Sequence, residues 1–198
     1  MRGKHKMSTS RMSDSRWIRR IRDAAAPTGS EADDMLEAAF AEHWSSVCKT
    51  LYRLLGDWGE AQDMALEAFW RLYTRPPRDL SHLAGWLYRT ATNLGLNAIR
   101  ARRRRQRHEE AAGALRLQRA DPVSPAEEVE RRETQGRVRD VLSRMEPRKA
   151  RLLLLRHTGH SYAEIADILG VASGSVGTML SRAERDFERR YRAREDTQ

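Results

Sequence analysis

The chain has 198 residues and a formal net charge of +9, from 37 Lys and Arg against 28 Asp and Glu. This length allows one domain or two small ones, and the basic balance indicates a polyanionic partner, nucleic acid before a membrane surface. The single cysteine, Cys48, excludes an internal disulfide framework and favours a reducing, cytoplasmic location. No segment has the length of a transmembrane helix or the apolar core of a signal peptide, so we expect no membrane insertion.

Strand signals are nearly absent, and Ala, Leu, Arg and Glu dominate the composition. We therefore predict an all-α fold of two small helical domains joined by a flexible linker. The predicted parts are a disordered basic arm at 1–30, a first domain at 31–107, a linker at 108–128 and a second domain at 129–198. Within the arm, a transient helix is expected around Trp17, Ile18 and Ile21. The arm suits a loose grip on nucleic acid, and it suits a solubilising tail equally well.

Two amphipathic helices are predicted to open the first domain, from Asp33 to Leu55 and from Glu60 to Tyr73. The buried stripe of the longer one comprises Leu36, Phe40, Trp44, Val47, Leu51 and Leu54. The shorter helix carries three acidic residues on another face, Glu60, Asp63 and Glu67. In a cationic protein such an acidic strip is either a solvated face or a docking surface for a basic partner.

A third helix is predicted from Ser81 to about Arg107, after a break that the two prolines of Arg75–Arg78 impose. One face of this helix combines an aromatic ring, two amides and two guanidinium groups. Such groups can stack on a base, bind its edge and hold a phosphate. The basic run at the end of the helix also favours nucleic acid over simple solvation. The residues of this face are Trp86, Arg89, Asn93, Asn97 and Arg100.

The apolar pattern is lost after His108, where Gly113 and the segment Asp121–Pro125 indicate a linker. It returns from Glu127 to Met145, and Pro147 is well placed to begin a further helix that ends near His157. No acid or cysteine completes a metal site with the histidines of this region, so we expect neither a metal nor a cofactor.

The segment from Ser161 to Arg185 predicts a helix-turn-helix. Ser161 and Glu164 have the spacing of a capping box, and Gly170 supplies the left-handed residue that ends the first helix. Ser173 or Ser175 can cap the second helix. Its outward face carries hydroxyl and guanidinium groups suited to phosphates and base edges in a major groove. We predict that this face binds DNA through Ser173, Ser175, Thr178, Ser181, Arg182 and Arg185.

With these residues in view, the chain resembles a sigma-70 family initiation factor of the extracytoplasmic-function (ECF) type, over about Asp33 to Arg190. The stretch Asp57–Tyr73 resembles the helix that docks on the β′ coiled coil of RNA polymerase. The stretch GWLYRTATNLGLNAIRARRRR resembles the helix and loop that open and read the promoter minus-10 element. Val138–Arg185 resembles the domain that reads the minus-35 element and touches the β flap. No single motif is decisive, but their order and spacing together are specific.

The resemblance implies a transcription initiation factor without enzymatic activity. Glu60, Asp63 and Glu67 would dock on core polymerase, the face around Trp86 would hold melted minus-10 DNA, and the helix-turn-helix would read minus-35 duplex. Sequestration by an anti-sigma partner is common in this family. In the recognition helix, Gly177 and Met179 stand where the family commonly has basic residues. A glycine inside a helix costs about 1 kcal/mol relative to alanine.

Two other functions stay open at this point. The first is an ordinary helix-turn-helix regulator that binds palindromic duplex DNA as a dimer, which would need neither the acidic strip nor the aromatic–amide face. The second is a sigma-like adaptor that has lost promoter reading, which Gly177 and Met179 make conceivable. An enzyme is disfavoured, because the sequence offers no nucleophile–base pair, metal-ligand cluster or glycine-rich phosphate loop.

Overall fold

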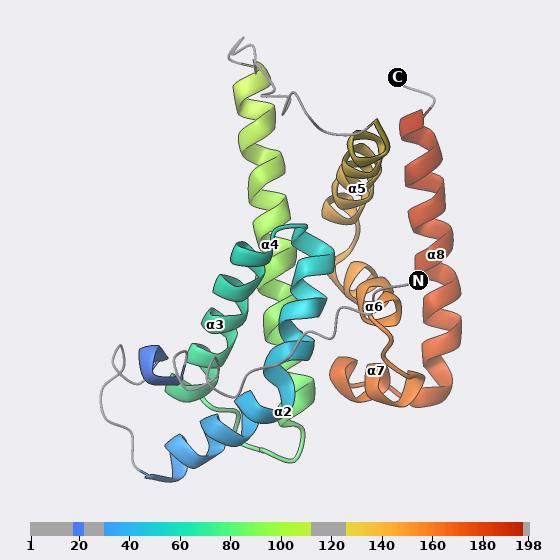
Figure 1. Ribbon diagram of the computed structural model, residues 1–198. Helices are drawn as coiled ribbons and strands as arrows, with labels where there is room; N and C mark the ends of the chain where they lie inside the picture. Colours follow the sequence, from blue (N-terminus) through green and yellow to red (C-terminus); the bar gives the residue numbers. More distant parts are fainter. Residues whose placement is uncertain (1–17, 22–29, 112–125, 196–198) are drawn as a thin grey trace, which may run out of the picture.

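The structure is a computed structural model of the whole chain, and it describes residues 18–21, 30–111 and 126–195. All the regular elements in these ranges are α-helices, which confirms the predicted fold class. Figure 1 shows α2, α3 and α4 gathered on one side of the molecule and α5 to α8 on the other. Positions 112–125 of the predicted linker and most of the N-terminal arm lie outside the described residues, while 108–111 and 126–128 belong to helices. The predictions made for those segments therefore remain predictions.

Three helices form the N-terminal domain: α2 (Ser30–Leu55), α3 (Trp58–Thr74) and α4 (Leu83–Ala111). The side chain of Asp57 caps α3 by accepting a hydrogen bond from the amide of Glu60 at 2.7 Å. The predicted stripe of α2 is buried throughout, and Phe40 of α2 packs against Phe69 of α3 with ring centroids 4.2 Å apart. The short helical stretch at 18–21 also belongs to this body, since Ile21 is fully buried.

Four helices form the C-terminal domain: α5 (Ala126–Arg144), α6 (Pro147–His157), α7 (Tyr162–Leu169) and α8 (Ser173–Glu195). Pro147 begins α6 as predicted. The apolar residues Ile165, Val176 and Leu180 are buried where α7 meets α8. Among the described helices, none is by itself long and apolar enough to cross a membrane. The bent pair α7 and α8 reaches that threshold only when the two are taken together, by length and composition.

Several element boundaries differ from the sequence predictions. Helix α4 continues to Ala111, four residues beyond the predicted end at Arg107, because its arginine-rich end has high helix propensity. Helix α8 already begins at Ser173, so Ser175 lies inside its first turn, where its amide bonds the carbonyl of Ala172. Ser175 is therefore a first-turn residue and not a cap.

Candidate polymerase- and DNA-binding surfaces

The helix-turn-helix is formed as the sequence predicts. Both bonds of the capping box are present: Ser161 Oγ accepts from the amide of Glu164 at 3.2 Å, and Glu164 accepts from the amide of Ser161 at 2.7 Å. These bonds lower the pKa of the Glu164 carboxyl. Gly170 adopts the left-handed conformation, with φ of 64°, and α7 and α8 meet at 90°. This geometry turns the chain so that α8 packs along α6 and α5.

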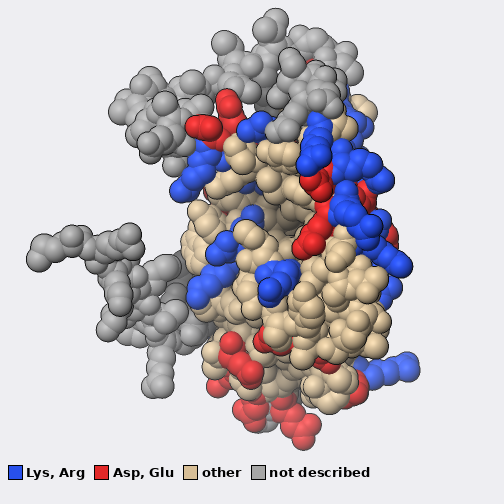
Figure 2. Space-filling model, turned by 90° about the vertical axis from the view of Figure 1, so that its right-hand side faces the viewer, with Lys and Arg blue, Asp and Glu red and all other residues tan. Residues whose placement is uncertain are grey.

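The predicted recognition face of α8 points to solvent. Two side chains in the middle of this face bond to carbonyls one turn earlier in α8. Ser181 donates to the carbonyl of Gly177 at 3.2 Å, and Arg185 Nε donates to the carbonyl of Ser181 at 3.1 Å. Figure 2 looks at the side of the molecule that carries α8, and Lys and Arg gather over its upper half, where the C-terminal part of the helix lies. The recognition residues at the start of α8 lie below this basic area and are exposed, so they can meet a phosphate backbone without rearrangement of the helix. All six predicted residues are exposed: Ser173, Ser175, Thr178, Ser181, Arg182 and Arg185.

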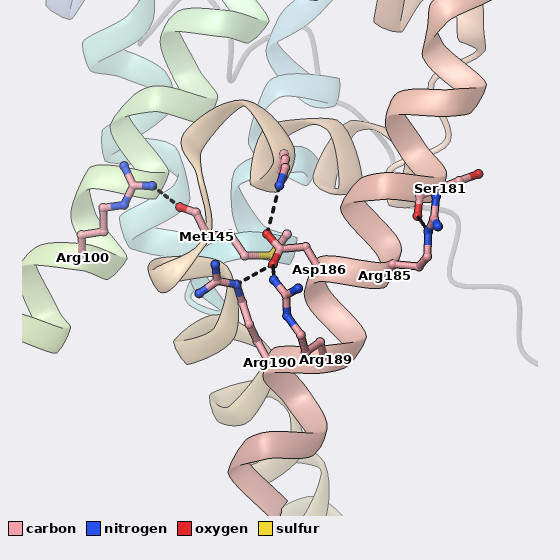
Figure 3. A network of polar contacts seen from close by, with 8 residues as sticks. Arg100, Met145, Ser181, Arg185, Asp186, Arg189 and Arg190 are labelled. Carbon is pink, nitrogen blue, oxygen red and sulfur yellow. Dashed lines mark hydrogen bonds and ion pairs between the residues drawn. The ribbon is translucent and has the colours of Figure 1, made fainter.

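A charge network fixes α8 against α6. Asp186 is buried, and its carboxylate accepts hydrogen bonds from Lys149 at 3.3 Å, Arg190 at 3.0 Å and Arg189 at 2.5 Å (Figure 3). Burial by itself would raise the pKa of Asp186, but the hydrogen bonds from Arg190 and Lys149 outweigh it and hold the pKa below its ordinary value. The network thus couples the recognition helix to the domain core.

We predict that Asp186→Asn lowers the free energy of unfolding by roughly 1–3 kcal/mol at pH 7, because the clustered cations lose their shared carboxylate. Since the folded pKa lies below the unfolded value, this contribution is complete above about pH 4 and disappears as the pH falls through the folded pKa. Urea unfolding at neutral and at acid pH measures the loss of stability and its dependence on pH. The control is Glu188→Gln, which removes an exposed carboxylate paired with Arg192 on the same helix. Equal losses in the two variants would contradict this role.

The acidic strip of α3 is divided by the structure. Asp63 is exposed and Glu67 is half-exposed, with its carboxylate accepting from Arg71 at 2.7 Å. Glu60 is bound to Arg102 of α4 and its side chain is only 23% exposed. Of the three residues predicted to dock, Asp63 and Glu67 therefore face solvent, while Glu60 joins α3 to α4.

The predicted minus-10 face of α4 is likewise divided. Arg89, Asn93 and Asn97 are exposed, while Trp86 is partly buried against the core. Arg100 donates from Nη2 to the carbonyl of Met145 at 3.0 Å (Figure 3) and from Nε to that of Ser143 at 3.3 Å. The amide oxygen of Asn93 accepts a hydrogen bond from Arg151 of α6. Two of the five predicted side chains are thus engaged by the C-terminal domain.

Arg151, which bonds Asn93, is an interdomain residue that could not be identified from the sequence. It is buried on α6, and this burial, followed by the nearby charge of Arg89, lowers the pKa of its guanidinium. Its Nε has no hydrogen-bond partner among the described residues. The sequence offers one signal for a buried Arg151: it directly precedes the apolar run Leu152–Leu155, at a helix position where burial is expected.

The two domains also enclose a groove of about 970 Å³ between α2 and the helices α5, α6 and α8. Arg53 of α2 meets His157 of α6 across it, with 3.2 Å between Nη1 and Nε2. Arg139 of α5 reaches the carbonyl of Leu55 at 3.3 Å, and burial lowers the pKa of its guanidinium. Within the described ranges, no group of His, Cys, Asp or Glu side chains is arranged to hold a metal ion.

Comparison with known proteins gives the same two-domain division. The family model for sigma-70 region 2 matches residues 39–105, and the model for sigma-70 region 4 matches residues 135–187. The first range runs from within α2 to within α4 and the second from within α5 to within α8, in the order expected from the sequence.

Three relatives illustrate the similarity. The ECF RNA polymerase sigma factor SigW of Bacillus subtilis is 30% identical over 155 residues, which cover 74% of this chain and 83% of that protein. The probable ECF RNA polymerase sigma factor SigI of Mycobacterium tuberculosis is 29% identical over 161 residues, covering 77% of this chain and 54% of that protein. SigG of the same species is 29% identical over 206 residues, covering 88% and 55%. The match thus spans about half the length of the two mycobacterial relatives. On this evidence the chain belongs to the sigma-70 family, among the ECF RNA polymerase sigma factors.

Proposed function

We propose that the chain binds core RNA polymerase and directs it to specific promoters through three separate surfaces. Helix α3 is the docking surface, α4 holds the melted minus-10 strand and α8 reads minus-35 duplex. The observation that carries this proposal is the joint presence of both sigma regions, in order, with exposed acidic residues on α3 and an exposed hydroxyl–guanidinium face on α8. A sensor or dimerisation domain would need neither the acidic surface nor the amide face of α4.

The docking partner proposed for Asp63 and Glu67 is the β′ coiled coil of the polymerase. The acidic side chains require that the surface they meet is basic. The partner proposed for the C-terminal domain is the β flap, beside minus-35 duplex. Both assignments rest on the family resemblance together with the exposure of the residues concerned. An anti-sigma partner remains a prediction from the resemblance alone. The proposed role requires no chemical step, cofactor or metal.

Sedimentation of the purified chain with sigma-free core polymerase tests this proposal. We expect a 1:1 complex with core and no dimer of the free chain at micromolar concentration. A dimer that shifts palindromic duplex DNA and does not sediment with core would instead establish the regulator function.

Recognition of duplex by α8 predicts a specific salt dependence. Arg182→Ala should weaken binding of the holoenzyme to promoter duplex and reduce the slope of log K against log salt by about 1, because one phosphate contact is lost. The matched control is Arg192→Ala, an exposed arginine of the same helix that ion-pairs with Glu188. Filter binding at several salt concentrations measures both slopes. An equal change in the control would assign the effect to overall charge and not to a contact.

A further inference from the structure

The groove between α2 and the helices α5, α6 and α8 takes no part in the function proposed above. None of the side chains assigned to core polymerase, to the minus-10 strand or to minus-35 duplex lines it. Its volume of about 970 Å³ lies within the range of small-molecule sites, roughly 300–1,000 Å³. The groove is therefore a separate feature that is large enough to hold a ligand.

The walls of the groove are strongly basic. Glu184 is the only carboxylate among the lining residues. Five permanent cations stand against it, and they come from both domains: Lys49, Arg53, Arg131, Arg139 and Arg156. Within the described part of the chain, neither Lys49 nor Arg53 nor Arg156 is ion-paired with a carboxylate. A concave surface of one charge sign concentrates ions of the opposite sign, so the groove is suited to an anion.

Two of these cations already contact protein groups that leave their charge uncompensated. Arg53 Nη1 lies 3.2 Å from His157 Nε2, and a guanidinium can only donate, so this imidazole nitrogen must accept. Arg139 is half-buried and bonds only the neutral carbonyl of Leu55, at 3.3 Å. Burial, followed by the nearby charge of Arg102, lowers the pKa of the Arg139 guanidinium. An anion in the groove would stabilise both charged groups.

The lining also offers apolar and aromatic surface. Tyr52 of α2 is 41% exposed, and Phe187 of α8 is half-buried. Exposed aromatic rings and guanidinium planes both stack on planar ring systems. Guanidinium groups also match phosphate oxygens in pairs, through two parallel hydrogen bonds. The aliphatic part of the lining consists of Val138, Leu142, Leu153 and Leu154.

We propose that this groove binds a nucleoside polyphosphate. The base stacks on Tyr52, and the phosphates lie where α2 meets α6, between Arg53 and Arg156. Such a ligand joins a planar body to several negative charges, which is the combination that the aromatic and basic lining favours. This site goes beyond the promoter-directing function and does not rest on it, because the two share no residue.

Fluorescence anisotropy tests the proposal on the free full-length chain, with GTP that carries an N-methylanthraniloyl group as the labelled ligand. We expect saturable binding of one nucleotide per chain, and displacement by unlabelled GTP or ATP. Inorganic triphosphate has the charges without the base, and guanosine has the base without the charges. Each should compete at least about tenfold more weakly than GTP, since each keeps only part of the contacts. Absence of saturable binding, or equal competition by triphosphate, would overturn the proposal.

A double variant tests the basic walls. Arg53→Ala with Arg156→Ala removes one exposed cation from each domain and is expected to weaken nucleotide binding at least about tenfold. The matched control is Arg75→Ala with Arg78→Ala, which removes the same charge at exposed positions between α3 and α4, outside the groove. The control should bind as the wild type does. An equal loss in both would assign binding to net charge and overturn the site.

Tyr52→Ala tests the stacking contact without changing the charge. Because this side chain is exposed, the variant is expected to fold, which circular dichroism checks. A base stacked on an aromatic ring contributes about 1–3 kcal/mol, so affinity for GTP should fall about five- to a hundredfold. The weak binding of inorganic triphosphate should stay the same. Unchanged affinity for GTP would contradict the proposed position of the base.

A further competitor distinguishes a mononucleotide from a nucleic-acid strand. We expect an oligothymidylate to displace the labelled nucleotide no better than GTP does. If it displaces the nucleotide at a much lower concentration, and the Arg53 and Arg156 variant loses this effect, the groove belongs to a single strand. The nucleotide proposal would then be wrong.

Discussion

Charge reversal on α3, by Asp63→Lys together with Glu67→Lys, is expected to abolish co-purification of the chain with core polymerase. The two carboxylates are four residues apart on one helix face and reach solvent. If they meet a basic surface, reversal replaces attraction with like-charge contacts that cost several kcal/mol, a loss of at least about 100-fold in affinity. Pull-down with tagged core at moderate salt measures this directly.

A matched control separates docking from net charge. Asp34→Lys with Glu188→Lys makes the same change in charge at exposed acids of α2 and α8. Glu188 is also paired with an arginine four residues on, as Glu67 is, so each double variant loses one such helix pair. The control should retain core binding. Unchanged binding of the α3 variant, or equal loss in the control, would remove α3 from the docking surface.

Trp86→Ala is expected to reduce open-complex formation by about ten- to a hundredfold while leaving initial duplex binding unchanged. A base stacked on an aromatic side chain contributes about 1–3 kcal/mol, and this contribution exists only after the strands separate. Permanganate reactivity of unpaired thymines measures the open complex, and a gel shift at low temperature measures the initial one.

Because Trp86 is partly buried against the core, the free energy of unfolding of the variant is measured alongside. Trp58→Ala is the control, since Trp58 is an exposed tryptophan at the start of α3, stacked edge to face with Tyr52. Trp86→Phe should recover most of the activity by keeping an aromatic ring. Equal losses in initial and open complexes would contradict a role in holding melted DNA.

The individual helices could be predicted because their signals are local. The capping box of Ser161 and Glu164, the left-handed Gly170 and the buried stripe of α2 depend on residues close together in the sequence, and all are present. The start of α8 could not be decided from the sequence, because two serines near a helix start are equally good caps by type. In the structure both serines lie inside the helix, which begins at Ser173 directly after Ala172.

The packing of the two domains could not be predicted from the sequence. Asn93 and Arg151 are 58 residues apart, and the partners of Arg100 are main-chain carbonyls, which carry no sequence signal. The close approach at Gly85 follows from the shapes of two assembled surfaces, not from any local pattern. The sequence therefore predicted which side chains suit DNA, but not that the protein itself engages some of them.

In vitro transcription tests the central claim most directly. The purified chain is added to sigma-free core polymerase with a fragment library from its own genome, and the RNA 5′ ends are sequenced. A promoter-directing sigma factor predicts discrete new start sites, preceded by a shared two-part sequence near positions −35 and −10. Binding to core without any new transcript would contradict this account and establish the adaptor function instead.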